Sequence, residues 1–420
     1  MKKIIIISYF FPPSHFVGGE RILFWAKNLH INNIYPIIIT RCWNESQKDI
    51  IGRVKNNIAR EEKHKDYEIH YLPYRHQLRD YFSEYPFVRK ALTLIYQILF
   101  HIYPGSINYI NFLKKAETLI TESSEINTVI ISGKPFESFY IGYRLKKKFG
   151  NINWIPDYRD EWNTFQDKKT KGSSVKFLSI LERRAEKKFT SNARLFITTS
   201  KIWANRIKTS INKDYLIVQN GFVGNIKNNL NTTVNHLKII YAGSLHPNQK
   251  IEPFLEIVSE INKRENNFII IEFIGSEMVP GQLGRLKKIK KNHIGNLDII
   301  SKQTKEDLNA KILKADLLYL TSFENVQGWL PVKIFEYSKY LSPIVLYPSD
   351  KGYMEKFIST TNSGFFFNNS KELKESLIRF IKIKKSGEAI SCERNLEEIK
   401  KYSRSNQTKI LGEYLNDYII

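Results

Sequence analysis

Two carboxylates and a guanidinium follow an apolar run in the segment NWIPDYRDEW, residues 153–162. Asp157, Arg159 and Asp160 stand where this run ends, and open α/β sheets bind ligands at the carboxyl ends of their strands. A carboxylate beside a guanidinium can position an acceptor hydroxyl group or stabilise a developing charge. An ion-paired strand end has the same composition, so the spacing alone leaves both interpretations open.

A glycine pair follows the first apolar run, in KKIIIISYFFPPSHFVGGERILFWAKNLH at 2–30. A strand, a glycine-containing loop and a helix direct backbone N–H groups towards one point, which suits a phosphate. Gly18 and Gly19 would also let a ligand approach the backbone closely. The segment matches neither GxGxxG nor a P-loop. Taken alone, it is more typical of a plain turn.

Two segments of the second half carry related patterns. YAGSLHPNQKIEPFLEI at 241–257 repeats the strand, glycine and helix order with Gly243 and Lys250. In NVQGWLPVKIFEYSKYLSPIVLYP at 325–348, Gly328 precedes an expected helix that carries Lys333 and Glu336. Residues three apart share a helix face, so this lysine could contact a pyrophosphate while the carboxylate accepts two ribose hydroxyls. The alternative is a weak surface ion pair.

Short apolar runs alternate with longer amphipathic segments along nearly the whole chain. Continuous apolar runs are typical of parallel strands that helices cover on both faces, and two such series predict two doubly wound α/β domains. We expect domains at 1–223 and 236–395, a polar linker at 224–235, and a closing helix at 396–420. The runs include 4–8, 35–40, 126–132, 154–158 and 194–200 in the first series, and 237–244, 268–276, 315–320 and 342–348 in the second.

The chain has 420 residues and a formal net charge of +23, from 65 Lys and Arg against 42 Asp and Glu. Such a charge favours anionic partners, although a general richness in Lys, Asn and Ile explains it equally well. The two cysteines exclude a disulfide framework or a thiolate zinc site. The sequence shows neither a signal peptide nor a membrane span, so we expect a cytoplasmic protein that associates peripherally with the membrane.

The segment 84–116, EYPFVRKALTLIYQILFHIYPGSINYINFLKKA, is apolar and aromatic with basic residues at its edges. One interpretation is a pair of helices packed on the first sheet. The other is an interfacial face that enters anionic lipid headgroups. The two interpretations are compatible.

Taken together, the ordered motifs resemble bacterial family-4-type glycosyltransferases of the GT-B fold. The resemblance runs along nearly the whole chain, and its remaining pieces are KPFESFYIGYRLKKKFG at 134–150, ITTSKIWANRI at 197–207 and VQNGF at 218–222. It implies two Rossmann-like domains facing a cleft, with a nucleotide-diphosphate sugar held mainly by the C-terminal domain and the acceptor by the N-terminal one. Such enzymes usually retain anomeric configuration and need neither a metal nor a further cofactor.

The resemblance also implies roles for individual residues. Lys333 would contact the diphosphate and Glu336 the ribose, while Gly18 and Gly19 would let the first loop approach the donor. Arg159 and Asp160, with Asp157, become the catalytic candidates, and the leaving diphosphate would be stabilised electrostatically. Donor contacts are also expected from Gly243, Lys250 and Gly328.

Two positions depart from the family's pattern. Gly328 stands where a first glutamate is usual, and Ser244 stands where an arginine usually follows the glycine of the second-domain loop. Lys250 is therefore the candidate that supplies charge to the phosphate in that loop. A second carboxylate on the donor sugar is not expected.

The expected function is transfer of a sugar, of the hexosyl type, from a nucleotide sugar to a saccharide or lipid-linked acceptor in surface polysaccharide assembly. A nucleotide-sugar epimerase of the same fold is a less favoured alternative, because paired carboxylates and histidines are not evident. A basic, non-catalytic binding or scaffold protein is the third. No nucleic-acid-binding motif accompanies the charge, so we expect no specific nucleic-acid partner.

Overall fold

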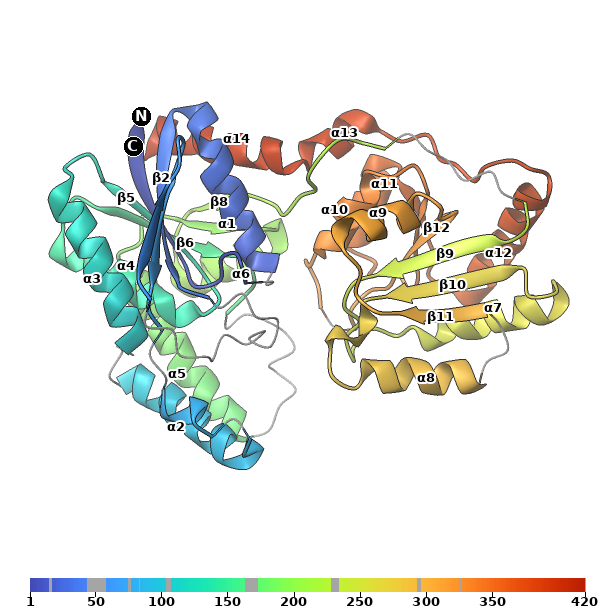
Figure 1. Cartoon of the computed structure of the whole chain (residues 1–420), viewed down its shortest axis with the longest axis horizontal. Coiled ribbons are helices and arrows are strands. Elements are labelled where there is room, and N and C mark those ends of the chain that lie inside the picture. Colours follow the sequence, from blue (N-terminus) through green and yellow to red (C-terminus); the bar gives the residue numbers. More distant parts are fainter. Residues whose placement is uncertain are drawn as a thin grey trace. The chain divides into compact units, whose positions relative to one another are not determined.

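The computed structural model of the chain describes residues 1–14, 17–43, 58–74, 77–82, 84–102, 107–162, 173–227, 234–292, 296–324 and 326–419. The chain forms two compact units (Figure 1). Unit 1 comprises Met1–Gln219 and Arg404–Ile420, and unit 2 comprises Asn220–Ser403. Each unit contains its own sheet.

Unit 1 is built on an eight-stranded sheet with the order β3-β4-β2-β1-β5-β6-β7-β8. Only β3, at the edge, pairs antiparallel with its neighbour. Alternate residues of the apolar runs point to opposite faces: Ile4 and Ile6 belong to one core cluster, and Ile5 is equally buried. The strands are β1 (Lys2–Ser8), β2 (Ile34–Arg41), β3 (Arg60–Lys63), β4 (Glu68–Leu72), β5 (Thr128–Ser132), β6 (Asn153–Tyr158), β7 (Phe196–Thr198) and β8 (Tyr215–Ile217).

Helices connect these strands and cover the sheet. The hydroxyl of Ser200 caps α6 by accepting from the Trp203 N–H, and Asn212 ends that helix in a left-handed conformation, as capping residues of these types do. The helices of unit 1 are α1 (Val17–Asn28), η1 (Leu29–Asn32), η3 (Leu78–Asp80), α2 (Pro86–Ile102), α3 (Ile107–Glu122), η4 (Phe136–Ser138), α4 (Phe139–Lys148), α5 (Ser173–Thr190), α6 (Lys201–Ile211) and α14 (Arg404–Tyr418).

Unit 2 has a six-stranded, fully parallel sheet with the order β11-β10-β9-β12-β13-β14. Ile239 and Tyr241 of β9 enter one core cluster, and Ile240 and Ala242 enter the other. The sheet is therefore buried on both faces, which explains the unbroken apolar runs. Its strands are β9 (Leu237–Ala242), β10 (Ile269–Ile274), β11 (Asn296–Ile300), β12 (Leu317–Leu320), β13 (Ile344–Leu346) and β14 (Gly364–Phe366).

The helices of unit 2 follow its strands in turn. They are α7 (Glu252–Arg264), η6 (Ser276–Met278), α8 (Gln282–Asn292), α9 (Lys305–Ile312), α10 (Val332–Ser338), α11 (Tyr353–Thr361), α12 (Ser370–Lys385) and α13 (Leu396–Lys401). Two Rossmann-like, doubly wound domains, predicted from the sequence, are confirmed by these sheets.

The compact units divide the chain at other positions than the sequence-based boundaries. The first unit ends at Gln219 rather than at 223, and residues 228–233 of the expected linker lie outside the described residues. The expected closing helix is two helices, α13 and α14, with the break at Tyr402 and Ser403. The Tyr402 carbonyl accepts from the Phe222 N–H there. Residues after the break belong to unit 1, because Leu411 and Leu415 enter its core cluster.

The segment 84–116 forms α2 and most of α3, and the two helices pack differently. α3 packs against α4 and β2, whereas α2 packs against α5 and η3. Of the two, α3 is the one in contact with the sheet. No helix of the described chain combines the length and the apolar character needed to cross a membrane.

Candidate functional site

The strand order of unit 2 reverses direction between β9 and β12, and ligands of open α/β sheets bind beyond the carboxyl ends of the strands at such a point. Gly243 follows β9 directly and has a φ of +99°. Lys333 on α10 reaches this loop, because its Nζ donates to the Ser244 carbonyl at 3.2 Å. The ammonium also lies 3.8 Å from the centre of the Tyr241 ring. The structure thus brings together Gly243 and Lys333, which the sequence assigned to one ligand.

The Lys333 ammonium is a cation that a ligand can use. Its Nζ forms no ion pair with a carboxylate anywhere in the described chain. Burial lowers the pKa of Lys333 to about 7, because the surroundings disfavour the charged form. Burial, together with the nearby Lys333, also lowers the pKa of His246. A bound anion would supply the missing counter-charge.

Buried polar groups support the loop that carries Gly243. The Tyr241 hydroxyl donates to the Ser244 carbonyl at 2.9 Å, and the Gln249 side chain accepts from the His246 N–H at 3.0 Å. The Gln249 amide also donates to the Thr321 carbonyl at 3.2 Å. These bonds fix the loop against the end of β12.

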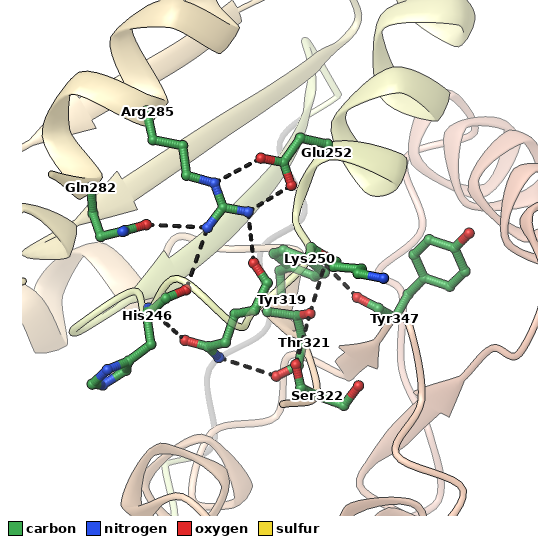
Figure 2. A network of polar contacts seen from close by, with 10 residues as sticks. His246, Lys250, Glu252, Gln282, Arg285, Tyr319, Thr321, Ser322 and Tyr347 are labelled. Carbon is green, nitrogen blue, oxygen red and sulfur yellow. Dashed lines mark hydrogen bonds and ion pairs between the residues drawn. The ribbon is translucent and has the colours of Figure 1, made fainter. Parts of the chain in front are cut away.

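Arg285, in the upper left of Figure 2, holds the same loop from α8. Its guanidinium contacts both oxygens of Glu252, at 2.7 and 2.6 Å. It also donates to the carbonyls of Gln249 at 2.8 Å and His246 at 3.3 Å. Figure 2 shows Arg285, Glu252 and His246 converging from three separate elements. A planar guanidinium suits such a multiple contact.

The other predicted donor residues of unit 2 make different contacts. Lys250 pairs with Glu324 at 2.8 Å, and both side chains are exposed. Glu336 accepts from Lys339 at 2.6 Å. Gly328 lies in the loop before α10 with a φ of +80°, a conformation that favours glycine.

In unit 1 the strand order reverses between β1 and β5. Arg159, which follows β6, reaches this point and donates to the Gly133 carbonyl at 2.7 Å. Its guanidinium covers Gly18 so closely that a Cβ on this glycine would lie 1.0 Å from Nη1. A Cβ on Gly19 would lie 3.0 Å from the Phe11 Cα. The structure therefore brings Gly18 and Arg159 together, as the sequence predicted for one site.

The two predicted carboxylates beside Arg159 differ in environment. Asp157 is fully buried and accepts from Ser132 at 3.0 Å and from Arg21 at 3.2 Å. Arg21 also donates to the Val218 carbonyl at 2.9 Å. Burial lowers the pKa of the Arg21 guanidinium, an effect that Asp157 opposes. Asp160 is partly exposed and pairs with Lys134 at 3.1 Å.

Three contributors to these sites were missed in the sequence. Arg21 lies one turn after the glycine pair, and its partners Asp157 and Val218 are far away in the chain. Gln249 lies within the SLHPNQK loop and Arg285 within an ordinary basic helix. No local motif distinguishes the two arginines, because their partners come from remote elements.

No group of three or more His, Cys, Asp or Glu side chains within the described ranges is arranged to hold a metal ion. The polar groups at the two sites are instead ammonium, guanidinium and backbone groups. Such groups bind anions, and phosphate in particular.

No protein-family model matches the chain, and no curated protein sequence matches it. Solved structures do. The trehalose-6-phosphate synthase OtsA is similar with a TM-score of 0.66 at 10% identity, over 99% of each chain. TarM is similar with a TM-score of 0.62 at 12% identity, over 99% of this chain and 98% of TarM.

Alr3699/HepE from Anabaena, in complex with UDP and glucose, has a TM-score of 0.59 at 11% identity, over 99% of this chain and 100% of that one. At such identities the likeness establishes architecture. With two doubly wound sheets and this full-length similarity, the chain has the two-Rossmann-domain GT-B fold.

Proposed function

We propose that the protein is a glycosyltransferase that moves a sugar from a nucleotide-diphosphate sugar to a saccharide or lipid-linked acceptor. One observation carries the proposal. The Lys333 ammonium stands beside the Gly243 loop at the switch point of the unit 2 sheet, with no carboxylate partner in the described chain. An anionic diphosphate would supply the negative counter-charge that Lys333 lacks.

Different residues of unit 2 contact different parts of the donor. Lys333 contacts the diphosphate, and the Gly243 backbone allows its close approach. Glu336 lies one turn further along α10. Once its ion pair with Lys339 breaks, its carboxylate accepts hydrogen bonds from the ribose hydroxyls. As the glycosidic bond of the donor breaks, negative charge grows on the leaving diphosphate. A fixed ammonium stabilises that charge more in the transition state than in the ground state.

The residues of unit 1 act on the sugar and the acceptor. Arg159 is held by the Gly133 carbonyl above Gly18, where its charge can stabilise the reacting groups. Asp160 is the half-exposed carboxylate available to orient an acceptor hydroxyl once it releases Lys134. Asp157 is a positioning residue, because its oxygens contact Ser132 and Arg21.

The similar solved structures support this function. OtsA is a trehalose-6-phosphate synthase, and Alr3699/HepE is seen with UDP and glucose. A hexosyl donor, membership of the bacterial family-4-type enzymes, retention without a metal, and a role in surface glycan assembly at the cytoplasmic side of a membrane belong to the same proposal.

Calorimetry and turnover with a panel of UDP-, GDP- and CMP-sugars test the proposal. We expect one nucleotide class to bind and to be hydrolysed or transferred. Lys333→Ala should weaken that binding on the order of a hundredfold, since it removes a charge-assisted contact to phosphate. Lys385→Ala, an exposed lysine of unit 2 paired with Glu265, is the matched control.

Failure of every nucleotide sugar to bind or turn over would overturn the enzymatic function. Product analysis without an acceptor separates transfer from epimerisation, because an epimerase changes the sugar in its absence. Unchanged binding in Lys333→Ala would remove this lysine from the donor site while leaving the enzyme class open to the turnover result.

A further inference from the structure

Helix α2 exposes large apolar side chains to solvent. Phe87 is 85% exposed, Ile95 50% and Leu99 51%, and Val88 and Leu94 are exposed as well. Spacings of four and seven residues place side chains on the same side of a helix, so these five side chains form a single broad face. We call them the outward stripe.

Three polar residues of α2, Arg89, Thr93 and Tyr96, are half-buried, as are the apolar Leu92 and Ile98. The helix packs against α5 and η3. A surface helix of a water-soluble domain normally shows the reverse arrangement, with its apolar face inward. Contiguous exposed apolar side chains of this kind mark an interaction surface.

The charge around the stripe identifies the partner. α2 carries Arg89 and Lys90 and no acidic residue, and Lys90 is exposed. α5, on which α2 packs, carries five Lys or Arg against two Glu. In Figure 1, α2 and α5 lie together at one end of unit 1. Basic residues near an apolar face match the negative surface of a bilayer that contains acidic lipids.

We propose that the outward stripe of α2 docks unit 1 on an anionic membrane surface. The helix has 17 residues, about 25 Å at the usual rise per residue, and it lies in the plane of the interface with the stripe among the upper acyl chains. Lys90 and the exposed cations of α5 contact the headgroups. None of these residues belongs to the donor site, so membrane docking and donor binding can be tested separately.

Sedimentation of the full chain with vesicles tests the proposal. We expect binding to phosphatidylcholine vesicles that contain phosphatidylglycerol, and weaker binding to pure phosphatidylcholine. The triple variant Phe87→Ser, Ile95→Ser, Leu99→Ser should lower the affinity on the order of a hundredfold, because three apolar groups no longer enter the bilayer. Leu283→Ser, an exposed leucine of α8 in unit 2, should bind as the wild type does.

Brominated lipids provide a second readout if the triple variant does not fold. In Ile95→Trp the added indole should be quenched by vesicles of brominated lipid, whereas the added indole of Leu283→Trp should not. Absence of binding to acidic vesicles, or equal quenching in the two variants, would overturn the proposal. So would a concentration-dependent dimer that the triple variant abolishes while vesicle binding is unaffected, since a second copy would then cover the stripe.

Discussion

Each unit holds one cation against the glycine that follows its first strand, and the two arrangements differ in chemistry. In unit 1 the Arg159 guanidinium covers Gly18 and is anchored on the Gly133 carbonyl. In unit 2 the Lys333 ammonium lies 3.7 Å from the Cβ position of Gly243 and is anchored on the Ser244 carbonyl. Arginine stays charged at every physiological pH, whereas burial lowers the pKa of Lys333 to about 7. The glycine loop after the first strand thus lies beside a permanent charge in one unit and beside a titratable charge in the other.

The supports of the two sites differ as well. Unit 1 buries the Arg21–Asp157 ion pair beneath its site, and unit 2 supports its loop with neutral groups and the partly exposed Arg285–Glu252 pair. Removal of a supporting residue should therefore cost more unfolding free energy in unit 1 than in unit 2.

The largest effect is expected from Asp157→Ala. The change leaves the buried Arg21 without its carboxylate, which costs about 3–5 kcal/mol of unfolding free energy. Urea denaturation measures it. Glu125→Gln, which removes only an exposed pair with Lys3, should leave the midpoint unchanged. A stable but inactive Asp157→Ala protein would instead favour a direct catalytic role.

The second largest effect, on catalysis, is expected from Lys333→Ala. Loss of a charge that meets the growing charge of the leaving group is expected to lower kcat/KM about 10²–10³-fold, as removal of comparable electrostatic groups does. Steady-state kinetics with the donor identified by the panel measures this. Lys333→Arg should keep part of the activity, and Lys385→Ala all of it. Full activity in Lys333→Ala would show that Lys333 does not stabilise charge during the reaction, as is proposed for Arg159.

Gly243→Ala is expected to cost about 1–2 kcal/mol, because a side chain in a left-handed conformation is strained by that amount. The φ of +99° is the cause rather than crowding, since the nearest atom would lie 3.7 Å from the new methyl group. Thermal unfolding of the variant measures it. Gly150→Ala, where a Cβ would have open space, provides the control.

The pH dependence of nucleotide diphosphate binding separates the two cations. Free Lys333 is charged below a pKa of about 7, and a bound diphosphate raises that pKa. Above pH 7 binding must therefore take up a proton, and the Kd should rise by up to about tenfold per pH unit. Lys333→Arg should bind with the same affinity from pH 7 to 9. Calorimetry in buffers of different ionisation enthalpy detects the proton directly.

Gly18→Ala should have the smallest effect on stability. The new methyl group would meet the far end of the Arg159 side chain, which can turn away, so unfolding should change by less than about 1 kcal/mol. Activity should fall because the guanidinium is displaced. A large loss of stability would show that Arg159 is a structural support rather than a mobile charge.

Much of the fold was predictable because the buried strands are continuous apolar runs. Each of the nine predicted runs overlaps a strand of the structure, from β1 to β13. Five strands were missed: the polar strand β3, the short strands β8 and β14, and β4 and β11, which read EIHYL and NLDII. β3 reads REEK, and an antiparallel edge strand needs no apolar run, because it need not be buried on both faces.

The sites were predictable in part. Gly18 with Arg159, and Gly243 with Lys333, were identified because glycine loops and charged residues follow strands that end at one sheet edge. Arg21 and Arg285 escaped because their partners are remote in sequence. The pairing of Lys250 with Glu324 is another example, since nothing in the local pattern connects residues 74 positions apart.

The return of α14 to unit 1 determines the order in which the chain can finish folding. Unit 2 is encoded entirely between the two parts of unit 1, so every residue of unit 2 leaves the ribosome before Leu411 and Leu415 do. Because those two leucines complete the core of unit 1, the first unit to be synthesised is the last to close. A ribosome that stops near residue 403 therefore releases a finished unit 2 joined to a unit 1 whose apolar core is still open to chaperones.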